Sequence, residues 1–391
     1  MGEKKMKVKS NKNSPLKEVN RGKPLLRRSW EGSSSSLGGV GEGSKILVIQ
    51  QKMIGDVLVS SLICENLKLN YPDAEVHYLV NRFTIPVIKN HPYIDNIVVF
   101  EDEYRSSQLE FYKFLKRIRN ANYNVVIDAY GKLESNLITL FSGAETKIGW
   151  EKRYTKLLYT KTVKISNESK EGLGSAIENR LNLVKRFKNS RIKITQPKIH
   201  MTSNELEAAR KKIAKFSKTE ESSFIMISAL GSNKEKTYPL AYMAKVLDYV
   251  VQHTKALLIL NYIPSQKEQI RQLYGMCSKI TQSQILLDFE VGTIREFLAI
   301  TKFCKAVVGN EGGAINMAKA LDVPTFSIFS PWIDKQGWNG FENHNLKHAS
   351  VHVNDYKKDT SIIDNQAFTY DEFKPDLYLD LLSDFLLKHV N

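Results

Sequence analysis

Three stretches of the chain combine glycine with charged or hydroxyl side chains in patterns that suit the binding of a ligand and chemistry on it. The first, Gln51-Lys-Met-Ile-Gly-Asp-Val-Leu, follows a short apolar run and opens a helical pattern with Asp56 near its start. A carboxylate at the carboxyl end of a parallel strand faces the crevice where such sheets bind ligands. A helix cap is the alternative interpretation of Asp56, and both remain open.

The second stretch, Ala229-Leu-Gly-Ser-Asn-Lys-Glu-Lys-Thr-Tyr-Pro, joins a strand-like run to a helical pattern. The hydroxyl of Ser232 is suited to donate to a phosphate oxygen, and the ammonium of Lys236 is suited to neutralise that oxygen. A solvated polar loop is the alternative.

The third stretch, Val308-Gly-Asn-Glu-Gly-Gly-Ala-Ile-Asn-Met-Ala-Lys-Ala-Leu, reads as a strand, a glycine pair and a helix. The backbone amides at the helix start beside Gly312 and Gly313 are free, which predicts a binding site for a pyrophosphate. Glu311 suits the hydroxyls of a ribose or a sugar. A tight turn that requires glycine explains the pattern equally well.

Strand-like runs alternate with helical patterns twice along the chain. The runs are residues 45–50, 76–80, 97–100 and 125–129 and, after a polar connection that contains Pro197, residues 224–228, 256–260, 285–287, 306–309 and 325–329. Longer helical patterns, such as residues 108–121, separate them. This rhythm predicts two α/β units with parallel sheets that face each other across a cleft. A terminal helix is predicted within residues 373–389.

The composition is that of a basic globular protein. The 391 residues are 42% hydrophobic and carry a formal charge of +15, to which residues 1–44 contribute ten Lys or Arg against four Glu. Positive charge therefore remains in excess on the rest of the chain. It suits an anionic partner such as a nucleic acid, an anionic membrane face or a phosphorylated small molecule or lipid. A solvated basic surface is the alternative.

Residues 1–44 are poor in apolar side chains and end in a Gly/Ser tract, which predicts a flexible basic tail. No apolar run approaches the ~20 residues of a membrane-spanning helix. Cys64, Cys277 and Cys304 are odd in number and widely spaced, which argues against a disulfide framework. We therefore expect a reduced, cytoplasmic protein.

The positions of several other motifs in the sequence argue against the functions that these motifs usually indicate. The segment from Gly38 to Lys45 precedes its strand and has its last two residues in the wrong order for a phosphate-binding loop. The first strand is followed by no Gly-x-Gly-x-x-Gly, which disfavours a nicotinamide dehydrogenase. The acidic cluster Glu101-Asp102-Glu103 reads as a solvated loop rather than a metal site, and the histidines show no ligand spacing.

Taken together, these blocks resemble glycosyltransferase family nine, the heptosyltransferases of lipopolysaccharide core assembly. The resemblance rests on Ile54-Gly-Asp-Val-Leu, on Glu235-Lys-Thr-Tyr-Pro, and on Glu311-Gly-Gly-Ala-Ile-Asn-Met-Ala before Pro324. Asp128-Ala-Tyr-Gly and Lys147-Ile-Gly-Trp resemble further family blocks in the expected order. The family resemblance implies a GT-B fold, in which two Rossmann-like, doubly wound parallel-sheet domains face each other across a cleft.

The sequence patterns and the resemblance together give a predicted domain plan. It consists of the tail over residues 1–44, an acceptor-binding domain over 45–195, a nucleotide-sugar-binding domain over 196–370, and a C-terminal helix over 371–391 that is expected to pack back on the N-terminal domain. The resemblance supplies the roles of the two domains. It further implies inversion at the anomeric carbon without a metal or a cofactor.

The resemblance assigns roles to particular residues of this chain. Asp56 matches the catalytic base. The matches to donor contacts are Ser232, Lys236, Glu311, Gly312, Gly313 and Asn316. On the acceptor side, Gly55 belongs to the first block, and Lys132, Lys147, Lys152 and Arg153 are candidates to attract a phosphorylated lipid, with solvated lysines as the alternative.

We therefore expect an inverting transferase that moves a sugar, heptose from ADP-heptose in the family's usual case, to a lipopolysaccharide-core or related glycolipid at the inner-membrane face. Glu311-Gly312-Gly313 stands where the family often has Asp-Thr-Gly, and Asn316 stands where it often has His, so the donor remains open. The rival functions are another GT-B enzyme, such as a nucleotide-sugar epimerase, and a basic nucleic-acid-binding protein. The chain has no recognisable reading helix or aromatic RNA motif, so we expect no nucleic-acid partner.

Overall fold

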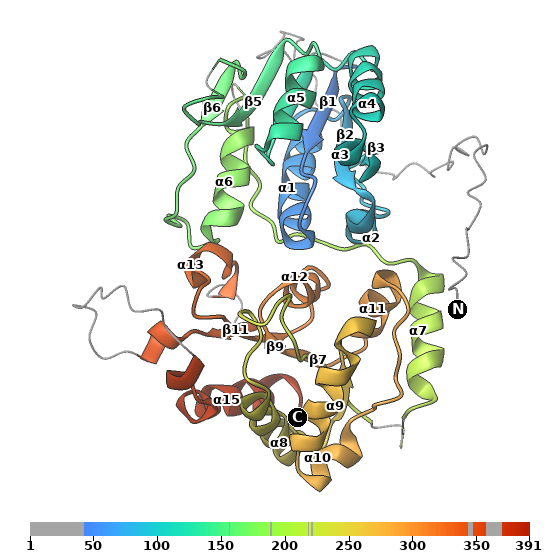
Figure 1. The fold of residues 1–391 in the computed structure, drawn as a ribbon, viewed down its shortest axis with the longest axis vertical. Coiled ribbons are helices and arrows are strands. Elements are labelled where there is room, and N and C mark those ends of the chain that lie inside the picture. The colour runs from blue at the N-terminus through green and yellow to red at the C-terminus, as the bar shows by residue number, and fades with distance from the viewer. Residues whose placement is uncertain are drawn as a thin grey trace, which may run out of the picture. The chain divides into compact units, whose positions relative to one another are not determined.

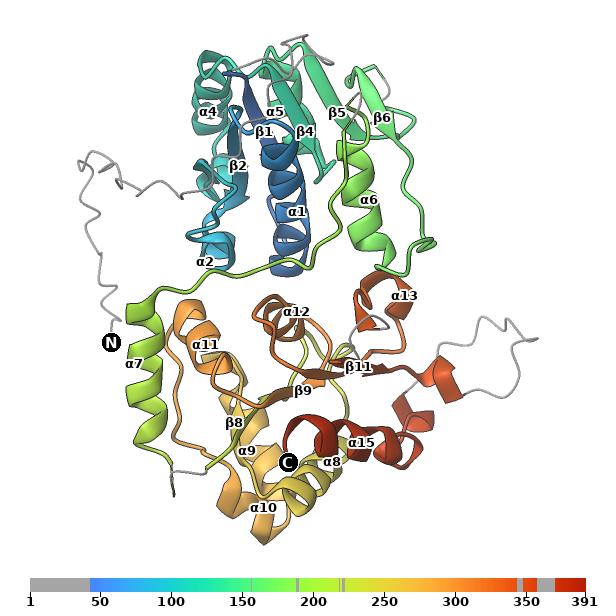
Figure 2. The same ribbon diagram turned by 180° about the vertical axis from the view of Figure 1, so that it is seen from behind.

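The computed structural model describes residues 43–155, 157–187, 190–217, 219, 222–342, 347–356 and 370–391. The predicted basic tail, residues 1–44, lies outside the described residues except for Gly43 and Ser44. Figures 1 and 2 show two sheets, each with its own helices. We call the β1–β6 sheet with its helices the N-terminal half and the β7–β11 sheet with its helices the C-terminal half.

Both sheets are parallel throughout, as the alternating pattern predicts. The first has the order β3-β2-β1-β4-β5-β6 and the second β11-β10-β9-β7-β8. The strands of the first are Lys45–Ile49 (β1), Glu75–Asn81 (β2), Asn96–Phe100 (β3), Val125–Asp128 (β4), Thr146–Trp150 (β5) and Lys161–Val163 (β6). Those of the second are Phe224–Ser228 (β7), Leu257–Leu260 (β8), Ala306–Asn310 (β9), Thr325–Ile328 (β10) and His348–Val351 (β11).

These strand orders determine where ligands can bind. In a doubly wound sheet, successive connections run to opposite faces on the two sides of one point, and a crevice opens there beyond the carboxyl ends of the strands. That point lies between β1 and β4 in the first sheet and between β7 and β9 in the second. The three stretches with chemical potential follow β1, β7 and β9, so all three lie at a crevice.

Helices cover both faces of each sheet. In the N-terminal half they are Ile54–Asn70 (α1), Ile85–Ile88 (α2) and Ser175–Val184 (α6) on one face, and Glu103–Ser106 (α3), Gln108–Asn120 (α4) and Leu133–Phe141 (α5) on the other. In the C-terminal half Ser203–Ala214 (α7), Ile294–Thr301 (α11) and Gly313–Ala320 (α12) cover one face. Leu240–Thr254 (α8), Lys267–Met276 (α9), Lys279–Gln284 (α10) and Leu379–His389 (α15) lie on the other, and Lys335–Trp338 (α13) follows β10.

The alternation of side chains along β1 explains this layering. Ile46 and Val48 belong to the core under α1, whereas Leu47 and Ile49 belong to the core under α4 and α5. Consecutive residues of a strand point to opposite faces, so a strand that is covered on both faces is apolar throughout. The core under α1 continues into the C-terminal half, where it includes residues of β7 and α12. The two halves thus share one apolar core.

Several predicted elements differ from the structure. The short strands β5, β6 and β11 were outside the predicted set, and residues 285–287 form only an isolated bridge from Ile285 to Leu258 instead of a strand. The expected docking of the terminal helix on the N-terminal half is wrong. Helix α15 packs against α8, and the ring of Phe385 lies 5.7 Å from that of Phe326 on β10. Its apolar stripe predicts burial but does not identify the partner face.

Among the described residues, no helix is long and apolar enough to cross a membrane. The three cysteines are free thiols, and all are buried, in agreement with the prediction of no disulfide framework.

Gly309 on β9 lets two strands approach at the crevice of the second sheet. Its φ is +132°, and a Cβ atom there would lie 2.3 Å from the carbonyl oxygen of Ser228 on β7. We expect Gly309→Ala to lower the free energy of unfolding by roughly 3 kcal/mol, because backbone strain of this kind costs about 1–3 kcal/mol and the clash adds to it. Urea unfolding measures the change.

Gly275→Ala is the matched control. Gly275 lies in α9, and apart from its chain neighbours and the backbone of its own helix no described atom comes within 4 Å of the Cβ position. Removing a helical glycine gains roughly 0.5–1 kcal/mol, so this variant should be slightly more stable than the parent. Equal stabilities of the two variants would contradict the close-approach argument.

Arg295 on α11 connects the two halves. Its guanidinium donates to the carbonyl oxygen of Pro86 on α2 at 2.9 Å and binds the carboxylate of Glu205 on α7 at 2.8 and 2.5 Å. The hydrogen bonds from Arg295 are the main reason that the pKa of Glu205 falls from 4.5 to about 2.

The lowered pKa of Glu205 predicts how stability depends on pH. The ion pair contributes fully above the unfolded pKa, and its contribution is lost as the pH falls through about 2. Glu205→Gln should therefore unfold more easily at neutral pH but lose less further stability between about pH 5 and pH 2. Urea unfolding at several pH values tests this, and parallel losses in parent and variant would refute it.

Candidate active site

Asp56 lies in the first turn of α1, immediately beyond the carboxyl end of β1. The N-cap of this helix is Met53, and the contact of the Asp56 side chain is an ion pair with Arg180 of α6. The carboxylate therefore forms a tertiary contact instead of the helix cap that was the alternative interpretation. Its side chain remains 23% exposed, so a ligand can reach it.

Arg180 is held in place by its own helix and by α1. Its guanidinium also donates to the carbonyl oxygen of Ala176 at 3.1 Å and to the hydroxyl of Ser60 at 3.4 Å. The side chain is 13% exposed. A largely buried guanidinium with several acceptors has few alternative rotamers, so it orients the carboxylate that it binds.

A cavity of about 440 Å³ opens beside Asp56 at the crevice of the first sheet. This volume lies within the range of ligand sites. Besides Asp56, the charged side chains on its wall are Lys52, Lys132, Lys152 and Arg180. Four cations around one carboxylate make the cavity electropositive, which suits an anionic ligand. The remaining wall consists of Gln50, Met53, Ala129, Tyr130, Trp150, Ile165 and Asn179.

Asp128 at the end of β4 shapes the turn that lines this cavity. Its carboxylate accepts hydrogen bonds from the backbone of Tyr130 at 3.0 Å and Gly131 at 2.8 Å, and from the hydroxyl of Tyr159 at 2.8 Å. Complete burial raises its pKa, and these hydrogen bonds oppose the rise. Asp128 thus binds the backbone of the turn that leads to Lys132 and does not line the cavity itself.

At the crevice of the second sheet, one amide side chain connects three segments. Asn310, the last residue of β9, donates from Nδ2 to the carbonyl oxygens of Ser228 at 3.0 Å and Ala229 at 2.8 Å. Its Oδ1 accepts from the backbone of Tyr238 at 2.7 Å. The end of β9 is thereby joined to both ends of the loop 229–239, which carries Ser232 and Lys236.

Lys236 and Glu311 lie near each other at this crevice. Burial raises the pKa of the Glu311 carboxyl, and the positive charge of Lys236 opposes the rise. The two residues come from different loops, 75 positions apart. Ser232 is exposed on the same loop as Lys236. The structure thus brings the ammonium of Lys236 near the carboxyl of Glu311, which directly precedes the N-cap of α12.

The start of α12 is open. Its N-cap is Gly312 with a φ of +143°, and within the described residues no atom lies within 4 Å of a Cβ built on Gly312 or Gly313. A helix start presents free backbone amides and the positive end of the helix dipole. An anionic group can therefore approach this backbone closely.

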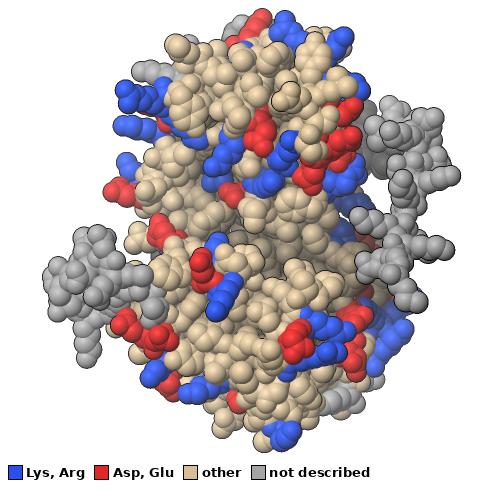
Figure 3. All heavy atoms as spheres, in the orientation of Figure 1, with Lys and Arg blue, Asp and Glu red and all other residues tan. Residues whose placement is uncertain are grey.

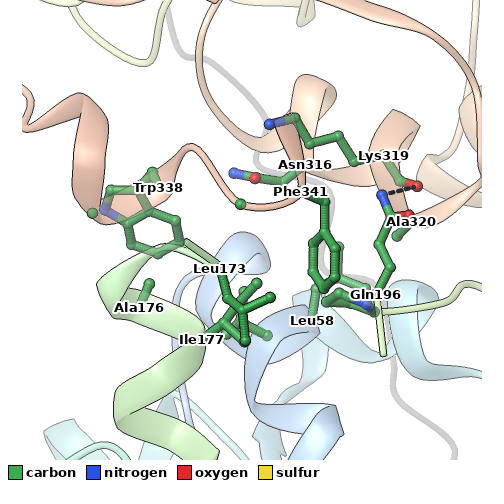
Figure 4. A pocket seen from close by; sticks show the side chains of 14 residues that line it. Leu58, Leu173, Ala176, Ile177, Gln196, Asn316, Lys319, Ala320, Trp338 and Phe341 are labelled. Atoms are coloured by element: carbon green, nitrogen blue, oxygen red, sulfur yellow. Dashed lines mark hydrogen bonds between the residues drawn. The ribbon is translucent and has the colours of Figure 1, made fainter. Parts of the chain in front are cut away.

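Helices α1 and α12 meet where the two candidate sites adjoin. A Cβ atom on Gly55 would lie 3.0 Å from Nδ2 of Asn316, so the absence of a side chain at Gly55 permits this approach. Figure 4 shows the neighbouring pocket, where Leu58 and Ile177 of the N-terminal half face Trp338 and Phe341. That pocket holds only about 30 Å³, the share of one water molecule in the liquid, and is too small for a sugar.

The structure separates the acceptor-side candidates. Lys132 lines the cavity beside Asp56, and Gly55 lies next to that cavity on α1. Lys147 does not line the cavity. This residue pairs with Val126, which lies two positions before the carboxyl end of β4. Arg153 is exposed and also lies off the cavity wall. Lys152, between them in sequence, reaches the wall and donates to the carbonyl oxygen of Gly131 at 2.5 Å.

Sequence reasoning missed Arg180 and Asn310. Arg180 is 124 residues from Asp56, and no local pattern links the two. Asn310 lies within the third stretch of the sequence. An amide side chain at the end of an apolar strand is suited to bind the backbone of a neighbouring loop, and this signal could have identified Asn310.

Comparison with known proteins identifies a family of glycosyltransferases. The family model "Glycosyltransferase family 9 (heptosyltransferase)" matches residues 111–360. Lipopolysaccharide heptosyltransferase 1 of Campylobacter coli is 21% identical over 291 residues, which cover 73% of this chain and 83% of the relative.

Two solved structures share the fold. A family 9 glycosyl transferase from Veillonella parvula aligns with a TM-score of 0.75 at 14% identity, covering 88% of this chain and 98% of the other. The E. coli ADP-heptose lipopolysaccharide heptosyltransferase II aligns with a TM-score of 0.66 at 17% identity, covering 88% and 99%. The two parallel sheets thus form the GT-B fold that the resemblance implies. Because the family model spans well over half of its residues, the chain belongs to glycosyltransferase family 9, the heptosyltransferases.

Proposed function

We propose that this enzyme moves heptose from ADP-heptose to a phosphorylated glycolipid of the lipopolysaccharide core by a single inverting displacement. The observation that carries the proposal is the position of its charged groups. Asp56 and four cations surround a cavity at one crevice, and Lys236 and the open start of α12 lie at the other. The two crevices adjoin where Gly55 meets Asn316.

In the proposed step, an acceptor oxygen bonds to the anomeric carbon of the donor while the bond from that carbon to the diphosphate oxygen breaks. Asp56 takes the proton of the acceptor hydroxyl, and the electron pair leaves with the nucleotide diphosphate. Negative charge grows on the leaving diphosphate, where Lys236 and the amides of α12 would stabilise it. In this proposal, fixed positive groups of the protein stabilise the negative charge of the leaving group.

On the acceptor side, Lys52, Lys132 and Lys152 on the cavity wall would bind the anionic part of the glycolipid. Phosphate groups are bound by such lysines as point charges. On the donor side, Glu311 is proposed to accept from sugar or ribose hydroxyls. The E. coli relative that shares the fold is named for ADP-heptose, which supports that donor.

A panel of ADP-, GDP- and UDP-sugars tests the donor by thermal shift. A ligand that binds only the native state stabilises it by about 2.7 kcal/mol at a hundredfold excess over its dissociation constant. ADP-heptose is expected to raise the melting temperature most. If a UDP- or GDP-sugar raises the melting temperature more than ADP-heptose does, that sugar is the donor and ADP-heptose is not.

Product analysis then tests the reaction. Incubation with labelled donor and a phosphorylated glycolipid should move the label into the lipid fraction and release nucleotide diphosphate. The rival epimerase would convert the donor sugar without an acceptor, so isomerised nucleotide sugar in an acceptor-free reaction would favour it. Salt-sensitive binding of RNA or DNA by a chain without residues 1–44 would favour the nucleic-acid alternative.

A further inference from the structure

Another cavity opens beyond the carboxyl ends of β10 and β11, apart from the two candidate sites. Its volume of about 310 Å³ lies at the lower end of the range of small-ligand sites, roughly 300–1,000 Å³. None of the described residues on its wall lines the Asp56 cavity or belongs to the predicted donor contacts. The side chains that the wall offers to a ligand include Trp332, Asp334, Lys335, Gln336, Asn354 and Asp355.

Trp332 gives this wall an aromatic surface that a ligand can reach, since the residue is 52% exposed. The turn that carries Trp332 is anchored by its neighbours. The backbone of Ile333 donates to the carbonyl oxygen of Ser330 at 3.0 Å, and the hydroxyl of Ser330 donates to the carbonyl oxygen of Glu235 at 3.3 Å. The second contact ties the turn to the polar loop before α8. The indole therefore stands on a fixed backbone.

Lys335 joins the segment after β10 to the segment after β11. Its ammonium donates to the carbonyl oxygen of Ser350 at 3.1 Å and forms an ion pair with Asp355 at 2.8 Å. The carboxylate of Asp355 also accepts from the backbone of His352 at 2.8 Å. The two sides of the cavity are thus held together, and the charge of Lys335 is already neutralised.

Three exposed polar side chains on the wall retain hydrogen-bonding capacity. One carboxylate oxygen of Asp334 accepts from the backbone of Gln336 at 3.0 Å. Within the part of the chain that the structure describes, the other oxygen and the side-chain amides of Gln336 and Asn354 make no hydrogen bond. A carboxylate accepts hydrogen bonds, and an amide both donates and accepts them. Together these groups match sugar hydroxyls, each of which is a donor and an acceptor.

We propose that this cavity binds one pyranose ring of a neutral carbohydrate. A pyranose carries C–H groups on its faces and hydroxyls around its edge. The indole of Trp332 would cover a C–H face, because a large aromatic ring supplies apolar contact area at a wet site. Asp334, Gln336 and Asn354 would bind the hydroxyls and orient the ring, as a few polar groups do in most small-ligand sites.

Other ligands suit this cavity less well. An anion such as a phosphate would meet the unpaired carboxylate of Asp334, while the ammonium of Lys335 is already paired. An organic cation would gain from an indole and a carboxylate, but a single aromatic ring does not form the cage that such cations use. Figure 3 shows that uncharged side chains make up most of the visible face of the C-terminal half. A neutral ligand therefore fits the cavity best.

The cavity lies beside the junction of the two halves. Helix α13, which begins on its wall, packs against α6, and Figure 1 shows α13 between α6 and β11. Among the described residues, neither Asp56 nor Lys236 lies on this wall, so the proposal does not rest on the proposed sugar transfer. A carbohydrate bound here would be held near the reaction without touching the reacting atoms.

Saturation-transfer NMR tests the proposal on the full chain without a nucleotide sugar. The probes are the methyl glycosides of glucose, galactose and mannose. We expect at least one of them to bind with a dissociation constant in the millimolar range, as befits a ligand of this size. Trp332→Ala should weaken that binding by roughly tenfold or more, because the apolar contact is lost. Asp334→Asn should weaken it by roughly fivefold, because a neutral acceptor forms a weaker hydrogen bond.

Matched controls lie elsewhere on the surface. Tyr112 on α4 is 60% exposed, so Tyr112→Ala removes an aromatic side chain of similar exposure. Asp384 is exposed on α15, so Asp384→Asn removes a comparable charge. Both variants should bind the glycoside like the parent. Trp332→Ala should keep the melting temperature of the parent, because about half of the side chain is already in water.

Several results would overturn the proposal. These are a parent chain that binds none of the three glycosides, a Trp332→Ala variant that binds as well as the parent, and a Tyr112→Ala variant that loses as much. Glycoside binding that is lost in Asp56→Asn but kept in Trp332→Ala would assign the sugar to the Asp56 cavity instead.

A second measurement separates this site from the donor site. The thermal shift produced by ADP should be the same in Trp332→Ala and in the parent. Loss of that shift would place a nucleotide on the indole and would also overturn the proposal. Because the glycoside assay contains neither donor nor acceptor lipid, its failure and the failure of the proposed sugar transfer are measured separately.

Discussion

Asp56→Asn is expected to lower turnover by roughly 10²–10⁴-fold, the usual contribution of general acid–base catalysis, while donor binding stays at the parent value. The amide cannot take the acceptor's proton. Its oxygen can still accept a hydrogen bond from Arg180, so the side chain should keep its place between α1 and α6. Residual transfer would reflect attack by an unassisted hydroxyl. Single-turnover kinetics with saturating donor and acceptor measure the chemical step.

Glu134→Gln is the control for the charge change. Glu134 lies on α5 near the same cavity but does not line it, and it forms an ion pair with Arg105. Its variant should turn over like the parent. If Asp56→Asn transfers sugar at the parent rate when chemistry is limiting, Asp56 serves only to pair with Arg180, and the catalytic role must be abandoned.

Lys236→Ala is expected to lower kcat/KM by roughly 10²–10³-fold, comparable to the loss of one group that stabilises a developing anion. Donor affinity should fall as well, because a charge-assisted contact to phosphate disappears. The substitution also removes the positive charge that opposes the raised pKa of Glu311. The pKa of Glu311 should then rise further, so the lower limb of the pH–rate profile should shift to higher pH.

Lys234→Ala tests whether any loop charge would have the same effect. Lys234 is exposed on the same loop, two residues before Lys236. Its loss should change kcat/KM little, since exposed charges in water are strongly screened. If the two alanine variants behave alike, the contribution is a general positive field of the loop. Unchanged kinetics of Lys236→Ala would return Lys236 to the solvated-loop interpretation.

Local patterns were sufficient to predict most of the fold. Apolar runs alternating with helical patterns predict parallel sheets, and β1, β7 and β9 are continuous apolar strands of this kind. The short strands β5 and β6 escaped the prediction because Thr146–Trp150 and Lys161–Val163 each mix polar and apolar residues. Their strand character comes from pairing with a neighbour, which sequence periodicity does not report.

The candidate site was predictable where it follows a strand. Asp56 and Gly312 stand directly beyond β1 and β9, so the strand direction alone brings them to a crevice. Arg180 was not predictable, because its contact with Asp56 depends on how α6 packs against α1. Lys147 illustrates the opposite error: it is basic and close in sequence to the cavity, but it lies near the amino end of β5.

The contact between Gly55 and Asn316 has a consequence for the range of sugars that the enzyme can handle. A backbone without a side chain meets the side-chain amide of Asn316 there, so a side chain at position 55 would crowd the contact between the helix that bears Asp56 and the helix proposed to receive the donor. Reacting atoms must approach to about 3–3.5 Å, and a misplacement of 1 Å can cost about 10²-fold in rate. We therefore expect larger or smaller sugars to be accommodated by the loops after β5 and β7. The range of substrates should therefore change through substitutions in those loops, while the distance between α1 and α12 stays constant.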